Sequence, residues 1–124
     1  MALDDITLTD SESTPVEHTM VYVAQQAQKV LRADLEAGTE TPIVLTIGHQ
    51  SRKVSQKVLR SHLVRIDWTL LDADGVTPYA NNLRLMCEIY DPVLSDALVD
   101  NLTACMSSFM TEANMRLLAR GSVF

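Results

Sequence analysis

The sequence predicts an α+β fold in which an antiparallel meander sheet of about six strands is followed by two C-terminal helices. Two observations support this prediction. Residues 1–90 contain several short segments in which apolar and polar residues alternate, which is the period of a β-strand. After residue 91 the apolar residues recur every three or four positions, which is the period of a helix. Because the strands come first and the helices last, the elements are segregated, unlike those of a parallel βαβ fold.

We expect a single domain over residues 1–124, with the sheet in 1–90 and a helical segment in 91–124. Hydrophobic residues make up 47% of the chain, which is enough for a packed core. No apolar run approaches the ~20 residues that cross a bilayer, so no membrane partner is expected. The acidic N-terminus is unlike a targeting segment, which predicts a protein made in cytoplasm.

Six strands are expected in the first part of the chain. The first two are at 3–9 and 19–24, joined across a polar turn at 10–15. A third is preferred at 29–35, although residues 24–37 have high helix propensity and a helical turn is the alternative. The remaining strands are at 43–48, 58–71 and 82–90. A basic turn is expected at 49–56, and a loop at 72–78 contains the hairpin signal Asp74-Gly75.

Two helices are expected after the last strand. Asp91 followed by Pro92 is typical of an N-cap and a first helical position. A second helix is expected from about 112 to 120, where Gly121 ends it. The first helix carries an apolar stripe formed by Leu94, Leu98, Leu102, Cys105 and Phe109. With Met106 and Met110 beside it, this surface exceeds what one small chain can cover, which predicts a partner subunit.

A basic block interrupts a chain whose net charge is −6. No Asp or Glu occurs between Glu40 and Asp67, yet this interval holds five of the ten Lys and Arg residues: Arg52, Lys53, Lys57, Arg60 and Arg65. A local positive field on a sheet favours a polyanion partner even in an acidic protein. A solvated strand face without a ligand is the alternative interpretation.

The motifs favour a structural or binding role over catalysis. The three histidines lack the spacing of metal ligands, and the four glycines form no phosphate-binding loop. Asp72 and Asp74 are not followed by the closing Glu of a calcium loop. We therefore expect that the protein is not an enzyme and that it binds no metal and no cofactor.

Four stretches and their order along the chain carry a family likeness: ALDDITLTD, IVLTIGHQSRK before the longest strand, DADGVTPYANNLRL before the last strand, and DPVLSDALVDNLTACMSSFM in the first helix. The pattern as a whole resembles the coat (capsid) proteins of levivirus-type single-stranded RNA bacteriophages. The likeness extends over essentially all 124 residues.

The resemblance implies a structural virion protein. Two subunits would form a homodimer with one continuous sheet and interlocked helices. Dimers would then self-assemble into an icosahedral shell around the single-stranded RNA genome. The resemblance also implies binding of an RNA hairpin as a translational repressor, and assembly in the host bacterial cytoplasm. A dimeric cytoplasmic RNA-binding regulator that forms no shell is the alternative.

Matching positions assign two sets of site residues. The expected dimer interface is the stripe Leu94, Leu98, Leu102, Cys105 and Phe109. The expected RNA-binding face consists of Val44, Thr46, His49, Ser51, Arg52, Lys53, Lys57, Arg65, Asn82 and Arg84. Its basic members would contact phosphates, whereas Thr46 and Asn82 would bind an unpaired base. Asp67 and Glu88 place two carboxylates on the same face.

Overall fold

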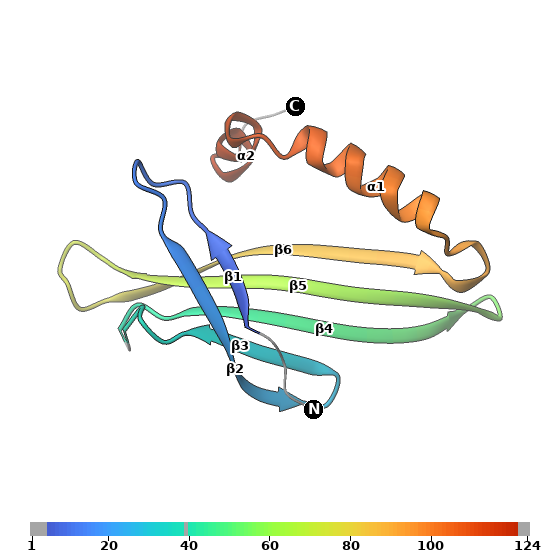
Figure 1. Cartoon of the computed structure of the whole chain (residues 1–124), viewed down its shortest axis with the longest axis horizontal. Helices are drawn as coiled ribbons and strands as arrows, with labels where there is room; N and C mark the ends of the chain where they lie inside the picture. The colour runs from blue at the N-terminus through green and yellow to red at the C-terminus, as the bar shows by residue number, and fades with distance from the viewer. Residues whose placement is uncertain (1–4, 39, 122–124) are drawn as a thin grey trace.

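The structure is a computed structural model that describes residues 5–38 and 40–121. Six antiparallel strands follow one another in a single sheet in sequence order, as predicted (Figure 1). The strands are β1 (Ile6–Thr9), β2 (Glu17–Gln26), β3 (Lys29–Asp34), β4 (Ile43–Val54), β5 (Lys57–Leu71) and β6 (Pro78–Tyr90). The 3-10 helix η1 (Asp91–Val93) and helices α1 (Asp96–Phe109) and α2 (Glu112–Ala119) follow. The predicted start of the first strand, at residue 3, lies outside the described residues.

The ambiguous segment at 29–35 is a strand, which confirms the preferred interpretation. β3 pairs with β2 on one side and with β4 on the other. Hydrogen bonding along both edges outweighs the local helix propensity of the segment, because propensity is weak against tertiary context.

The predicted basic turn at 49–56 is wrong over most of its length. β4 continues to Val54, and only Ser55 and Gln56 connect it to β5. These two residues have φ values of 50° and 64°, and a type I′ hairpin turn requires positive φ at both central positions. Neither is the Asn or Gly that normally signals such a turn. The hairpin is stabilised instead by the continuous pairing of β4 with β5.

The loop between β5 and β6 is held by Asp74. Its carboxylate accepts the backbone N–H groups of Val76 and Thr77 at 2.9 Å and the Thr77 hydroxyl at 2.6 Å. These hydrogen bonds lower the pKa of Asp74 to about 2, and the bond from the Thr77 hydroxyl has the largest effect. Gly75 has a φ of 73°, which favours glycine, so the predicted Asp74-Gly75 turn is confirmed.

The predicted start of the first helix is wrong. Asp91 and Pro92 begin η1 instead, and Asp91 accepts a hydrogen bond from Arg60 Nε at 2.6 Å. The N-cap of α1 is Ser95, whose Oγ accepts from the backbone N–H of Leu98 at 3.2 Å. The chain leaves α2 through Gly121 with a φ of 74°, as the sequence predicted.

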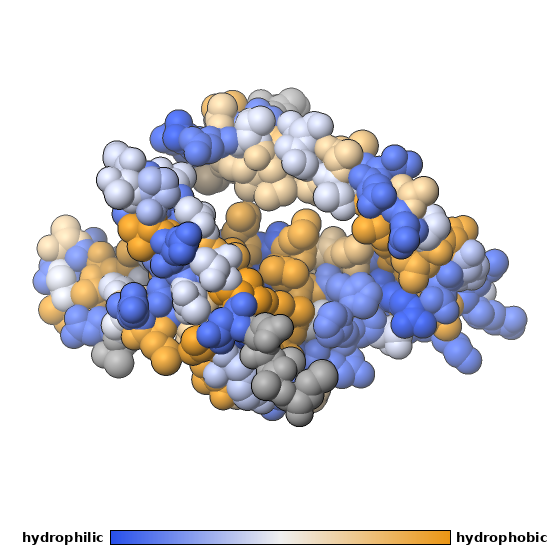
Figure 2. Space-filling view, viewed as in Figure 1, coloured by the Kyte–Doolittle hydropathy of each residue, from blue (hydrophilic) through white to orange (hydrophobic). Residues whose placement is uncertain are grey.

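The two helices do not cover the sheet of their own chain. In Figure 1, α1 and α2 lie beyond β6, the edge strand. Within the described part of the chain, only η1 of the C-terminal segment has a substantial contact with a strand, β5. Figure 2 shows open space between the helices and the strands, with hydrophobic residues on both sides of it. No described residue of α1 or α2 is buried.

The core lies where the N-terminal hairpin curls over the other strands (Figure 1). Met20 of β2 packs with Ile43 and Leu45 of β4, and all three are buried. Partly buried apolar residues surround this cluster, among them Ile6, Leu8 and Ile66. The hairpin of β1 and β2 therefore closes one end of the sheet without the help of a helix.

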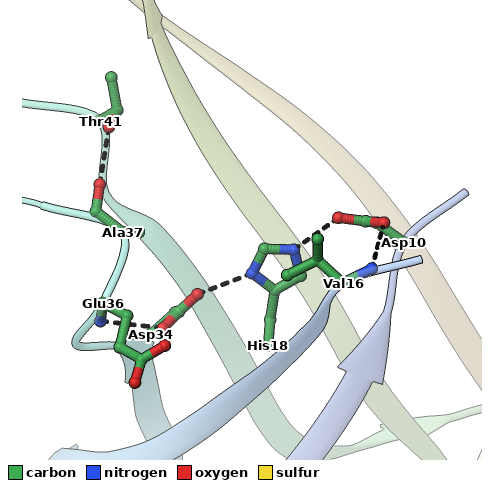
Figure 3. Close-up of polar contacts among 7 residues, drawn as sticks. All are labelled: Asp10, Val16, His18, Asp34, Glu36, Ala37 and Thr41. Atoms are coloured by element: carbon green, nitrogen blue, oxygen red, sulfur yellow. Dashed lines mark hydrogen bonds and ion pairs between the residues drawn. The ribbon is translucent and has the colours of Figure 1, made fainter. Parts of the chain in front are cut away.

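His18 of β2 fastens this hairpin through two carboxylates (Figure 3). Its Nδ1 lies 2.7 Å from Asp34 Oδ2 and its Nε2 lies 2.9 Å from Asp10 Oδ2. The imidazole also meets the Trp68 ring of β5 edge-on, with 5.4 Å between ring centroids. The hydrogen bonds with Asp34 and then Asp10 raise the pKa of His18. The bond with His18 lowers the pKa of Asp34 in turn.

Candidate nucleic-acid interface

The register of β4, β5 and β6 separates their side chains into two faces. Directly opposed residues of an antiparallel sheet lie on the same face. Leu45, Ile66 and Leu83 oppose one another, and we call their side the apolar face. Thr46 opposes Arg65, which opposes Arg84, and we call this second side the polar face. The predicted alternation of these strands is confirmed.

Seven of the ten predicted RNA-binding residues share the polar face: Val44, Thr46, Arg52, Lys57, Arg65, Asn82 and Arg84. The grouping of His49, Ser51 and Lys53 with them is wrong. These three oppose His62, Arg60 and Val58, which place them on the apolar face. The physical reason is that β4 does not end at Gly48, so its side chains keep alternating through the segment expected to be a turn.

The misassigned histidine belongs to a pair on the apolar face. The Nδ1 atoms of His49 and His62 are 2.7 Å apart, so one ring donates to the other. Cys87 opposes His62 on β6. Among the described residues, no three His, Cys, Asp or Glu side chains are placed to hold a metal ion.

The arginines of the polar face are engaged by neighbours within that face. Arg65 approaches Asp67 Oδ1 with Nε at 2.9 Å and with Nη2 at 2.8 Å. Arg84 Nε donates to Asn82 Oδ1 at 3.3 Å. Because Arg65 and Arg84 oppose each other, these contacts offset the repulsion between two guanidinium groups. Near the other end of the strands, Arg52 Nη2 lies 3.5 Å from Glu88 Oε2.

Lys29 is a polar-face residue that the sequence reasoning missed. It opposes Gly48 on β4, so it extends the positive charge of the face onto β3. A Cβ at Gly48 would lie 3.3 Å from Lys29 Cγ, so the Lys29 side chain lies directly against Gly48 of β4. The available signal was the alternation of 29–35, which places Lys29 beside Leu31 and Ala33 once the segment is taken as a strand.

The predicted dimer-interface residues are solvent-accessible in the single chain. Leu94 precedes α1 and is 48% exposed, whereas Leu102 and Phe109 lie on α1 and are 49% and 39% exposed. Leu98 is half-buried and Cys105 is an exposed free thiol. The apolar face is open as well, since Leu83 is 51% exposed. Two apolar surfaces of one chain therefore remain without a covering layer.

Among the described residues, the outer backbone edge of β6 is also unpaired. β6 is 13 residues long, and within the described residues it pairs with β5 alone. A long open edge strand offers a row of backbone donors and acceptors to another strand.

No described helix is long and apolar enough to cross a membrane.

Comparison by sequence finds no matching family model and no matching characterised protein. Comparison of structures finds several phage proteins. The virus-like particle of bacteriophage GQ-907 matches with a TM-score of 0.71 at 16% identity, covering 100% of this chain and 97% of that one. The particle of bacteriophage AVE019 matches with a TM-score of 0.70 at 12% identity and covers 100% of both chains.

A third structure is described as an unassembled virus coat protein dimer and a bacteriophage RNA-binding dimer. It matches with a TM-score of 0.59 at 10% identity, covering 98% of this chain and 97% of that one. Two of these structures are virus-like particles and the third is an unassembled coat protein dimer, and the resemblance stated from the sequence is confirmed at the level of the fold. The chain thus has the fold of bacteriophage coat proteins over its whole length.

Proposed function

We propose that the chain is a non-enzymatic coat protein of a single-stranded RNA phage, located in the virion. Two copies would pair along β6 into one continuous sheet, and each copy's α1 and α2 would lie over the apolar face of its partner. The dimers would then form an icosahedral shell, assembled in the host bacterial cytoplasm, with the polar face toward the RNA genome.

The observation that carries this proposal is the position of the helices beyond an open edge strand. α1 and α2 have apolar residues that their own sheet does not cover, and the sheet has an apolar face that its own helices do not cover. A second copy paired along β6 would bring both surfaces together and satisfy the backbone of the edge. Leu94, before α1, and the α1 residues Leu98, Leu102, Cys105 and Phe109 would then form the dimer interface.

The polar face supports the RNA-facing role. It carries Arg52, Lys57, Arg65 and Arg84 on a sheet with which α1 and α2 make no extensive contact. Cations of this kind bind phosphates and supply affinity without sequence information. Thr46 and Asn82 of the same face are suited to hydrogen-bond an unpaired base, which is how a hairpin of the genome would be bound as a translational repressor.

Expression of the full chain in bacteria is expected to yield closed particles of uniform size that contain RNA. Negative-stain electron microscopy would show the particles and their size, and the ratio of the absorbance at 260 nm to that at 280 nm would report the RNA inside them. A chain that remains monomeric at high concentration would contradict the proposal. Dimers that bind RNA without forming particles would instead support the alternative, a dimeric RNA-binding regulator that forms no shell.

A further inference from the structure

We infer that Asp67 and Glu88 lower the affinity of the polar face for polyanions that contact it at few points, an inference that rests on the RNA-binding role proposed above. The two carboxylates form ion pairs with neighbouring arginines of the polar face, Asp67 with Arg65 and Glu88 with Arg52. A phosphate that approaches either arginine is therefore repelled by the carboxylate beside it and competes with that carboxylate for the guanidinium donors. Polyanions that make few contacts would be rejected, whereas an RNA segment that engages the whole face would be retained.

The geometry at Asp67 carries the first step of this inference. Asp67 Oδ1 accepts a charge-assisted hydrogen bond from Arg65 Nε at 2.9 Å, and it lies 2.8 Å from Arg65 Nη2 in the same ion pair. The Arg65 side chain is 35% exposed and that of Asp67 26%, so the pair is partly shielded from solvent. The Nε–H, which a phosphate would otherwise use, is already bound within the protein.

The ion pair between Glu88 and Arg52 is longer than the one between Asp67 and Arg65, and it lies on the same face. Arg52 and Glu88 are 3.5 Å apart, with side chains 68% and 41% exposed. Solvent-exposed pairs of this kind contribute little to stability, so their main effect is on the local field. Arg65 and Glu88 lie on the same face, as do Arg52 and Asp67, so both carboxylates act on one surface.

The charge balance of the face follows from these positions. On β4, β5 and β6 the polar face carries four cations and two carboxylates, which leaves a net charge of +2. Neutralising both carboxylates would double this charge while leaving every cation in place. Because phosphate binding releases counterions, a higher local charge raises the affinity for any polyanion, whatever its sequence.

The test compares Asp67→Asn, Glu88→Gln and the double variant with the unchanged chain. The full-length protein is kept below the concentration at which particles form, and a short single-stranded RNA and a duplex DNA of equal length are the probes. We expect Asp67→Asn to bind RNA about fivefold more tightly, with a salt slope about one unit steeper. Affinity for the duplex is expected to rise as well, because the change in local charge acts on any polyanion.

Asp100→Asn on α1 is the matched control, because it removes the same charge away from the polar face. It is expected to leave both affinities unchanged, whereas Arg65→Ala is expected to weaken RNA binding. If Arg65→Ala weakens binding but the two carboxylate variants bind like the unchanged chain, or more weakly, the inference is overturned and the RNA-binding role stands. If the unchanged chain shows no salt-dependent RNA binding, the proposed function itself fails at this face.

Discussion

Replacing His18 by Gln is expected to lower the free energy of unfolding by about 2 kcal/mol at mildly acidic pH, since hydrogen bonds to charged groups contribute roughly this much. The imidazole stands between Asp10 and Asp34, whose side chains are 12% and 7% exposed. Without it, two largely buried carboxylates lose their shared counter-charge. Chemical denaturation at one fixed protein concentration would measure the change.

The effect depends on pH in a defined direction. His18 has a raised pKa in the folded chain, because only the protonated ring can donate to both carboxylates. Its stabilising contribution is therefore complete below the unfolded pKa of about 6.5 and is lost as the pH rises through the folded value. Asp34 has a lowered pKa, so its contribution is lost as the pH falls toward and below the usual carboxyl range.

The free energy of unfolding of the unchanged chain should thus decline from mildly acidic to alkaline pH, and His18→Gln should flatten this decline. Asp34→Asn, which removes one negative charge and keeps the imidazole, should move the decline to lower pH. An equally steep decline in the His18→Gln variant would show that another group causes it. His62→Gln is the matched control, because it removes a histidine from the other histidine contact, with His49.

Replacing Leu102 and Phe109 together by Asp is expected to weaken dimerisation at least a hundredfold and to prevent particle formation. In the proposed dimer both side chains lie against the partner's apolar face, and each copy contributes two of them. Charging central apolar positions of an interface typically costs about 2 kcal/mol or more at each of them. Sedimentation velocity over a concentration series would measure the dimer's dissociation constant.

The sheet of this variant should stay folded, because α1 has no extensive contact with any strand of its own chain in the described residues. Ala104→Asp with Ser107→Asp is the matched control, since the helical period places these residues on the side of α1 opposite the stripe. That control should still dimerise. Equal loss in both double variants would indicate damage to the helix, and an unchanged dimer in the Leu102 and Phe109 variant would exclude α1 from the interface.

Local patterns were sufficient to predict the order of the elements. Alternation identified the strands and the two faces of the central sheet, because a side-chain period of two is set by the backbone alone. The same rule failed at His49, Ser51 and Lys53, since a turn of Ser55 and Gln56 carries none of the residues that normally announce one. The helix start was misplaced because Ser95 competed with Asp91 as N-cap and made the hydrogen bond.

The contacts that hold the N-terminal hairpin could not be predicted from the sequence. Asp10, His18 and Asp34 are distant in the chain, and they meet with Trp68 only because the hairpin curls over the strands that follow. Likewise, nothing in the sequence indicated that Asp67 would hold Arg65, because both were known only to share a face. Local periodicity specifies which way a side chain points, whereas the contacts of His18 depend on the curvature of the sheet.

A cryo-electron microscopy structure of the assembled protein tests the central claim most directly. The account predicts that β6 of one copy runs antiparallel beside β6 of another, with α1 and α2 seated on the partner's apolar face around Leu83 and Leu85. A subunit whose helices fold back over its own strands, with the β6 edges left apart, would contradict it.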